Sequence, residues 1–255
     1  MSKTILLVTQ TENSSAPDGR VGPLLESKGY AVEWRCPAKG DWLPDNTESY
    51  AGTVVFGGPM SVNDTTKLPF LTHEIEWIAQ YVAAGGRYFG ICLGGQLLAR
   101  AFGAPVARHP DGLNEIGYYP ICATAAGAEL IDDSMHVYHW HNEGFQLPGG
   151  AELLAVGDAF PNQAFKLGQH AYGVQFHPEV TPKVARSWID EVPHQLAWPG
   201  AQPRDQHEDG FARHDSILHA WMSAFFDHWL GHQGPGNHAP APQPAPSAII
   251  PAVAG

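Results

Sequence analysis

Short apolar runs alternate with an amphipathic stretch along the first hundred residues. The runs rich in β-branched and aromatic residues, which predict strands, are Thr4–Val8, Thr53–Phe56 and Arg87–Ile91. Between the second and third runs, apolar residues recur at helical spacing, at Leu71, Ile75, Ile78 and Val82. We expect Thr72 to cap this helix and Gly85–Gly86 to end it. Strands that alternate with helices predict an α/β fold, with an open and mostly parallel sheet flanked by helices.

The middle third of the chain has a different pattern. Four short extended runs follow one another, at Glu115–Ala123, His136–His141, Glu152–Val156 and Ala171–Phe176. They predict a mixed or antiparallel extension of the sheet.

Helices are expected again toward the C-terminus. Thr181 followed by Pro182 has the form of a cap with a first-turn proline, which predicts a helix through Glu191. An apolar stripe predicts a further helix over Asp215–Leu230. The segment Pro193–His214 is rich in Pro, Gln and charge, and we expect a loop-like insertion there.

The charge balance limits the possible partners. The 255 residues include 26 acidic residues against 14 lysines and arginines, a formal net charge of −12. Because phosphate binding draws mainly on clustered Lys and Arg, this balance argues against nucleic-acid and anionic-membrane surfaces. No apolar stretch approaches the roughly 20 residues that span a bilayer, and the N-terminus lacks signal-peptide features. The three cysteines fit a reducing compartment better than a disulfide framework, so we expect a cytoplasmic protein.

From about Gly231 the composition changes to Gly, Pro, Ala and His. Such a segment cannot bury enough apolar surface to offset its ordering entropy. We therefore predict one folded domain over residues 1–231 and a disordered Pro/Ala/Gly-rich tail over residues 232–255.

Cys92 lies in the segment Gly90–Gln96, which directly follows the run Arg87–Ile91 and opens a helical pattern. A nucleophile at a sharp strand-to-helix turn needs small residues two positions before and after it, and Gly90 and Gly94 occupy those positions. The start of the following helix also stabilises a thiolate. The alternative is an inert, buried cysteine beside two packing glycines, and this motif alone leaves both open.

Two further segments can complete such a site. His177 and Glu179 follow the run Ala171–Phe176, and a cysteine nucleophile needs a base that a third group orients. Gly57 and Gly58 follow an earlier strand run, where backbone N–H groups can approach a substrate and form an oxyanion hole. Taken singly, the histidine could be an ordinary strand-end residue and the glycine pair a tight turn.

Together these segments resemble the class I glutamine amidotransferases of the Cys-His-Glu triad type, over nearly the whole span from Thr4 to Glu191. Within that family the chain is most similar to stand-alone relatives of the glutaminase domain of GMP synthase. The resemblance implies a flavodoxin-like glutamine amidotransferase fold. The segments that carry it are Val55–Val62, Gly90–Gln96, Trp140–Glu143, Pro161–Phe165 and Gly173–Glu179.

The resemblance implies a triad of Cys92, His177 and Glu179 that acts on the side-chain amide of glutamine. Cys92 would form a γ-glutamyl thioester and release ammonia, and water would then release glutamate. His177 would transfer the protons, and Glu179 would hold His177 in the productive tautomer.

By position, the resemblance also assigns the N–H groups of Gly58 and Leu93 to an oxyanion hole, with Gly57 beside them, and places Gln96 beside the bound amide. It implies no metal and no organic cofactor. Family members usually hand the ammonia to a synthetase domain or subunit, and this sequence shows none after residue 180 and no ATP-pyrophosphatase P-loop. A synthetase partner is therefore expected to accept the ammonia. Glu143 departs from the Asp that relatives often carry.

Three alternatives accompany this interpretation. The same triad could hydrolyse a γ-glutamyl bond in a peptide or polyamine conjugate, because no synthetase domain is visible. The fold could also serve as a non-catalytic binding or regulatory module, although that would predict a damaged triad. His139, His141 and Glu143 would share one face of a strand and could bind a metal. The resemblance accounts for His141 without a metal, so we expect none.

Overall fold

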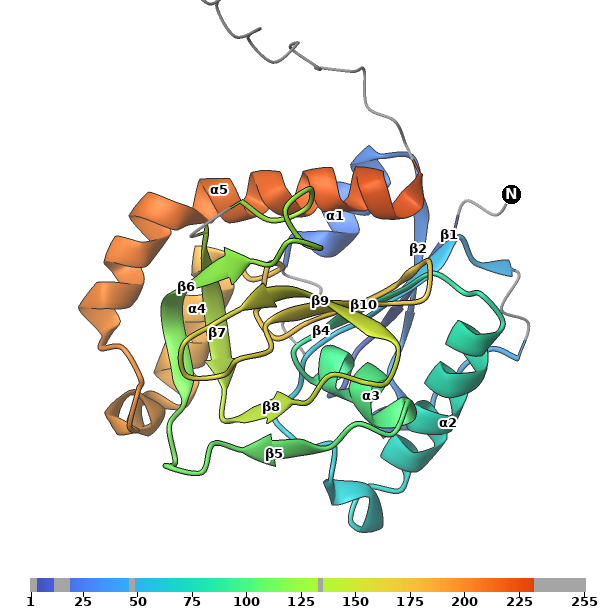
Figure 1. Ribbon diagram of the computed structural model, residues 1–255, viewed down its shortest axis with the longest axis horizontal. Coiled ribbons are helices and arrows are strands. Elements are labelled where there is room, and N and C mark those ends of the chain that lie inside the picture. The colour runs from blue at the N-terminus through green and yellow to red at the C-terminus, as the bar shows by residue number, and fades with distance from the viewer. Residues whose placement is uncertain (1–3, 12–18, 46–48, 133–134, 232–255) are drawn as a thin grey trace, which may run out of the picture.

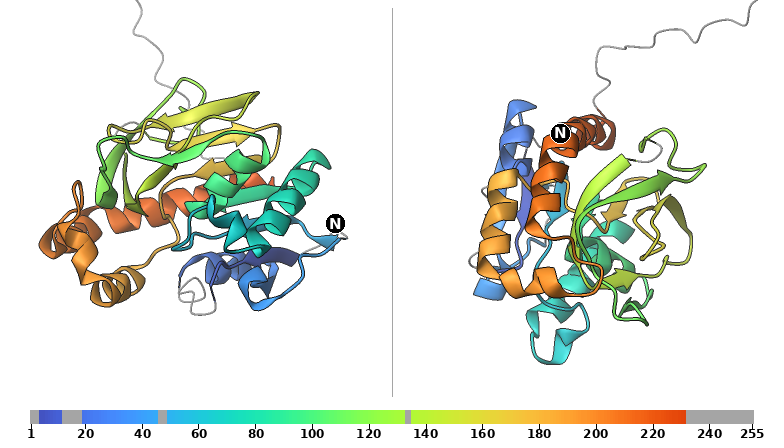
Figure 2. Two further views of the ribbon diagram at one scale, coloured as in Figure 1. Left: turned by 90° about the horizontal axis from the view of Figure 1, so that it is seen from below. Right: turned by 90° about the vertical axis from the view of Figure 1, so that its left-hand side faces the viewer.

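The computed structural model describes residues 4–11, 19–45, 49–132 and 135–231 (Figures 1 and 2). The predicted tail, 232–255, lies outside these residues. The strands are β1 (Thr4–Val8), β2 (Ala31–Arg35), β3 (Gly52–Val55), β4 (Tyr88–Ile91), β5 (Val106–Arg108), β6 (Glu115–Ala123), β7 (Met135–His141), β8 (Glu143–Phe145), β9 (Ala151–Val156), β10 (Ala164–Leu167) and β11 (Ala171–Val174). The α-helices are α1 (Val21–Ser27), α2 (Phe70–Ala83), α3 (Leu93–Ala101), α4 (Pro182–Glu191) and α5 (Arg204–Leu230). Short 3₁₀ helices are η2 (Pro37–Lys39), η4 (Asp64–Thr66) and η5 (Pro193–Ala197).

One large sheet has the strand order β2-β1-β3-β4-β11-β10-β9-β6-β7, and β5 pairs with β8 in a small second sheet. The first five strands of that order pair in parallel. The pairs from β11 through β10, β9 and β6 to β7 are antiparallel. The predicted α/β fold with an antiparallel extension is confirmed.

The parallel half is buried on both faces, as parallel sheets are. Alternate residues of a strand point to opposite faces. Ile5 and Leu7 of β1 therefore pack in the core under α1, α4 and α5, whereas Leu6 and Val8 pack under α2 and α3. Figure 1 shows α1 and α5 on one side of the strands and α2 and α3 on the other. Because parallel neighbours end at the same edge, the residues after β3, β4 and β11 meet there.

The predicted helix over Leu71–Val82 is α2, but its predicted cap is wrong. The helix begins at Phe70 after Pro69, and Thr72 is an exposed residue inside the first turn. At the next predicted cap, Thr181 Oγ1 accepts a hydrogen bond from the Val184 N–H at 3.3 Å, so α4 begins as expected.

The predicted loop over Pro193–His214 is wrong in its second half, because α5 begins at Arg204. Only one narrow stripe of this extra helix is buried, at His207, Gly210 and Phe211. So small an apolar share conceals helical periodicity in the sequence.

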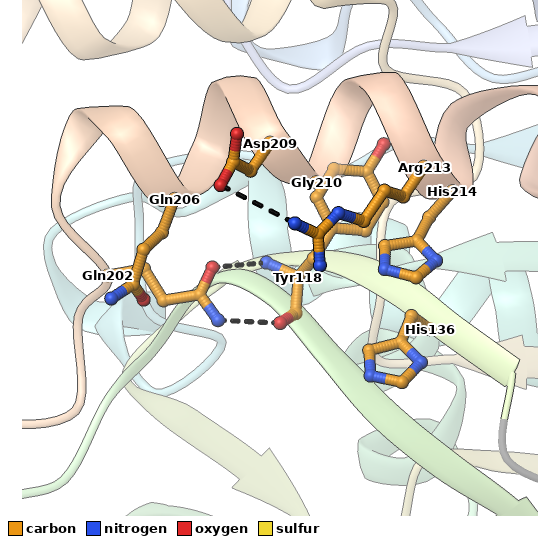
Figure 3. A pocket seen from close by; sticks show the side chains of 8 residues that line it. All are labelled: Tyr118, His136, Gln202, Gln206, Asp209, Gly210, Arg213 and His214. Carbon is orange, nitrogen blue, oxygen red and sulfur yellow. Dashed lines mark hydrogen bonds and ion pairs between the residues drawn. The ribbon is translucent and has the colours of Figure 1, made fainter.

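The segment before α5 is fastened to β6 by the side chain of Gln202. Its Oε1 accepts from the Tyr118 N–H at 2.9 Å, and its Nε2 donates to the Tyr118 carbonyl at 2.6 Å. Figure 3 shows this pair of bonds at one end of a shallow pocket between α5 and the β6–β7 pair. The segment is therefore part of the folded domain.

Candidate active site

Cys92 stands between β4 and α3 with backbone angles φ 50° and ψ −107°. Among the described non-glycine residues it alone has a positive φ, which carries strain of order 1–3 kcal/mol. Its neighbours must be small, because a Cβ on Gly90 would lie 2.3 Å from the Gly94 carbonyl oxygen. A Cβ on Gly94 would lie 2.1 Å from the Val55 carbonyl oxygen. The structure thus has the sharp strand-to-helix turn that the sequence predicts.

Partial positive charge surrounds the Cys92 sulfur. Cys92 is the N-cap of α3, so the N–H groups that begin with Leu93 lack intrahelical acceptors. The helix dipole places its positive end at the same point. Gln175 Nε2 also donates to Cys92 Sγ at 3.7 Å.

His177 and Glu179 follow β11, the strand beside β4. His177 Nδ1 donates to Glu179 Oε1 at 2.8 Å, and both side chains are buried. Burial alone would lower the pKa of His177, but the Glu179 carboxylate and the neighbouring Cys92 raise it to about 10. The raised pKa makes the His177 ring a base strong enough to take a proton from the neighbouring cysteine.

The second ring nitrogen of His177 is available for proton transfer. Nε2 has no hydrogen-bond partner among the described residues. A Cβ on Gly57 would lie 2.8 Å from His177 Cε1 and 3.3 Å from Cys92 Cβ. The histidine and the cysteine therefore flank the same glycine, and the three predicted triad residues come together.

Gly58 lies against the end of β1. A Cβ on Gly58 would lie 2.6 Å from Gln10 Cβ. Gln10 Nε2 in turn donates to Glu74 Oε1 of α2 at 2.8 Å, and both side chains are buried. A buried polar pair therefore supports the glycine turn from behind.

Two glutamines connect Cys92 to β8. Gln96 Nε2 donates to the Glu143 carbonyl at 2.9 Å and to Gln175 Oε1 at 3.3 Å. Gln175 completes the chain through its bond to Cys92. Sequence reasoning missed Gln175 as a site residue. Its position two residues before His177, on the same face of an extended segment, was the available signal.

These residues border a cavity of about 810 Å³. Gly57, Gly58, Gln96 and the triad line it, while Leu93 contributes only its position at the start of α3. Another part of the lining comes from α4, η5 and the residues after them, through Trp188, Glu191, Val192, Gln195 and Trp198. Trp140 Nε1 donates to Gln195 Oε1 at 2.7 Å and ties this wall to β7. The first half of the predicted loop-like insertion Pro193–His214 therefore forms part of the cavity wall.

Residues 29–191 match the family described as glutamine amidotransferase class-I. This span is well over half of the chain. The chain belongs to the class-I glutamine amidotransferase family. The glutamine amidotransferase-like protein YfeJ of Salmonella typhimurium is 35% identical to it over 204 residues, which cover 77% of this chain and 82% of that protein.

Two relatives of this chain have more specific names. The GMP synthase of Aeropyrum pernix is 32% identical over 63% of the chain, but the match covers only 31% of the GMP synthase. Gamma-glutamyl peptidase 5 of Arabidopsis thaliana is 29% identical over 59% of the chain and 62% of that protein. The crystal structure of a glutamine amidotransferase from Methylobacillus flagellatus superposes with a TM-score of 0.83 at 26% identity, over 94% of this chain and 100% of that one.

In this member of the family the structure corrects the candidate metal set. Glu143 Oε2 accepts from Ser61 Oγ at 2.7 Å, and Glu143 is not part of the group of ligand atoms formed with the two histidines. Glu115 of β6 takes its place beside His139 and His141. The sequence could not show this, because strand pairing sets β6 against β7 only in the fold. No helix within the described ranges is long and apolar enough to cross a membrane.

Proposed function

We propose that this protein hydrolyses the side-chain amide of glutamine, with Cys92 as the nucleophile. The observation that carries the proposal is the strained elbow that sets Cys92 against His177. The other nitrogen of His177 is bonded to Glu179 at 2.8 Å, which fixes the tautomer and the orientation of the ring.

Each triad residue has a defined role in this reaction. The Cys92 proton passes to His177 Nε2, and Sγ attacks the carboxamide carbon of glutamine. The C–N bond breaks as His177 gives that proton to the leaving nitrogen, so that ammonia departs and a γ-glutamyl thioester remains. Water loses a proton to His177 and attacks the thioester carbon. The C–S bond then breaks as His177 returns that proton to Sγ, so glutamate leaves and the Cys92 thiol is restored.

The tetrahedral intermediates carry a negative oxygen, and we assign the N–H groups of Gly58 and Leu93 to stabilise it. Gly58 lines the cavity beside Gly57, and Leu93 is the first residue of α3. Gln96 is assigned to the substrate amide from its place on the cavity wall.

Two opposite charges on paired strands suit the α-carbon end of glutamine. Arg108 of β5 pairs in register with Glu143 of β8, and both residues line the cavity. We assign Arg108 to the α-carboxylate and Glu143 to the α-ammonium group. The ammonia would pass to a synthetase partner, as the likeness to a GMP synthase suggests.

The test is release of ammonia and glutamate from glutamine by the purified chain, for wild type, Cys92→Ala and Cys122→Ala. Cys122 is an exposed cysteine and serves as the matched control. We expect turnover by wild type and Cys122→Ala, and none by Cys92→Ala. Turnover by Cys92→Ala would refute the role of Cys92.

The size of the cavity favours a second candidate function, hydrolysis of γ-glutamyl conjugates. At about 810 Å³ it is in the upper range of ligand pockets, which run from about 300 to 1,000 Å³ for drug-sized ligands. Trp188 and Trp198 supply apolar surface, and Glu191 supplies negative charge. A γ-glutamyl peptide or amine conjugate would use the same triad, as the name of the Arabidopsis relative suggests.

Parallel assays with glutamine, γ-glutamyl dipeptides and γ-glutamylputrescine separate the two functions. A higher kcat/KM for glutamine supports the amidotransferase function. Turnover of a conjugate without turnover of glutamine supports the second function and rejects the first. If wild type, tested with every compound, shows no turnover and no labelling of Cys92 by a glutamine-mimicking electrophile, both functions are rejected.

A further inference from the structure

A buried cluster of three metal-ligand side chains lies next to the catalytic cavity. Glu115 of β6 pairs in register with His141 of β7, and His139 lies two residues earlier on the same strand. All three side chains are buried, and His139 has no exposed surface. Their ligand atoms all lie within 4.8 Å of one another. The triad mechanism uses none of them.

The three atoms form a triangle of the size that a metal ion requires. His139 Nδ1 lies 3.2 Å from His141 Nε2, His141 Nε2 lies 2.9 Å from Glu115 Oε2, and His139 Nδ1 lies 3.5 Å from Glu115 Oε2. Tetrahedral ligands held about 2.0 Å from a zinc ion lie about 3.3 Å from one another. The triangle therefore matches one face of a tetrahedral site.

The hydrogen bonds around the three ligand atoms leave too few protons to place one between each pair of them. His141 Nδ1 faces the Glu143 carbonyl at 3.0 Å, and since a carbonyl only accepts, this nitrogen carries the proton. If the His141 ring is neutral, its Nε2 then carries no proton, and its lone pair faces the Glu115 carboxylate. His139 can place at most one proton among the three atoms. His139 Nε2 has no hydrogen-bond partner among the described residues, with or without a bound metal, so it does not distinguish the two cases.

The outer contacts resemble those that orient metal ligands. Metal-bound histidines usually donate their second nitrogen to a carbonyl or carboxylate, as His141 does to Glu143. Ligating carboxylates are in turn hydrogen-bonded, and Gln163 Nε2 donates to Glu115 Oε2 at 2.9 Å. Two nitrogens and one carboxylate oxygen suit zinc rather than calcium or magnesium, which prefer oxygen ligands.

We propose that Glu115, His139 and His141 bind one divalent transition-metal ion of the zinc type. His141 borders the catalytic cavity, so a water molecule or a ligand from the cavity can take the fourth position. The His177 N–H donates to the carbonyl of Tyr138 in β7 at 2.7 Å. The ion would therefore join β6 to the strand that supports the catalytic histidine. The proposal does not depend on the substrate of Cys92.

The competing arrangement has no metal and places a second proton on His141. That proton makes a buried imidazolium–carboxylate pair with Glu115. The two arrangements have the same side-chain positions, so metal binding must be measured directly.

The experiment uses the full chain with Cys92→Ala, because a cysteine beside His177 is itself a zinc ligand. After chelator treatment, Zn²⁺ binding is measured by calorimetry, and Co²⁺ binding by visible absorption, which reports a tetrahedral site. We expect one equivalent to bind. Glu115→Gln and His139→Gln, each added to this background, should weaken binding by about 100-fold or more, since changes to outer contacts alone cost 10–100-fold. The control His219→Gln removes an exposed histidine of α5 and should change nothing.

Nitrogen NMR of labelled histidines keeps the test decisive if a variant fails to fold. In the parent protein, one equivalent of Zn²⁺ should shift the resonances of His139 Nδ1 and His141 Nε2. Absence of binding to the parent, unchanged affinity in folded Glu115→Gln and His139→Gln, or unshifted resonances of these two nitrogens would each overturn the proposal.

Discussion

At the scale of single residues, Cys92 is held in its strained conformation by the hydrogen bonds of its own backbone. Its N–H donates to the Val174 carbonyl at 2.8 Å, and its carbonyl accepts from the Gln96 N–H at 2.9 Å. The first bond belongs to the sheet and the second to α3, so the strand and the helix together fix the turn. Close approach from Gly57 then leaves His177 little room to move.

Gly57→Ala tests this close approach. The new Cβ would lie 2.8 Å from His177 Cε1, so the ring must shift from its present position beside Cys92. We expect kcat for glutamine to fall by about 10²-fold while the fold is retained, because displacements of about 1 Å have effects of this size. Gly149→Ala is the matched control, since its Cβ meets nothing within 4 Å. Steady-state kinetics beside circular dichroism make the comparison. An unchanged kcat in Gly57→Ala would show that His177 tolerates displacement.

At the scale of elements, the contact between α2 and the end of β1 is unusual because it buries a carboxyl group. Glu74 is 1% exposed, and its Oε2 has no partner among the described residues. Burial raises the pKa of Glu74 to about 7, although the bond from Gln10 lowers it in part. Gln10 packs against Gly58 and donates a hydrogen bond to Glu74. The glycine turn is therefore supported by a carboxyl group that titrates near neutral pH.

Glu74→Gln should therefore stabilise the protein in a pH-dependent way. The folded pKa of about 7 lies above the ordinary value of 4.5, so the folded state binds the proton more tightly. Wild-type stability then falls as the pH rises from 4.5 through 7. We expect the variant to exceed wild type at pH 8 by as much as about 3 kcal/mol, with the gain disappearing below pH 4.5. Urea unfolding at several pH values measures it, with exposed Glu76→Gln as the control. A gain independent of pH would contradict this account.

At the scale of the whole molecule, local patterns in the sequence predict the parallel half of the fold well. The buried run Thr4–Val8 is a strand with the predicted bounds, and the runs Thr53–Phe56 and Arg87–Ile91 are strands whose bounds differ by one residue, because burial on both faces demands continuous apolar sequence. The edge strand β2 was missed because its residues are only partly buried and include Glu33 and Arg35. Glu115 lies beside the two histidines because of the register of β6 with β7, which no local sequence pattern specifies.

One side chain joins three distant parts of the chain behind the site. Arg20, which is 7% exposed, donates through Nη2 to the Val180 carbonyl at 2.8 Å and to Asp215 Oδ1 at 2.6 Å. Its N–H donates to the Glu179 carbonyl at 3.1 Å. The start of α1 and the middle of α5 are thereby fastened to the segment that carries Glu179.

Arg20→Ala should destabilise the whole domain, because it leaves the Asp215 carboxylate and the Val180 carbonyl without their partner. Breaking a buried ion pair costs about 3–5 kcal/mol, and since Asp215 is 24% exposed we expect about 2–3 kcal/mol here. Arg186→Ala breaks the exposed pair with Glu208 and should cost less than about 1 kcal/mol. The free energies of unfolding in urea compare the two variants. Equal losses would show that Arg20 contributes no more to stability than an ordinary surface charge.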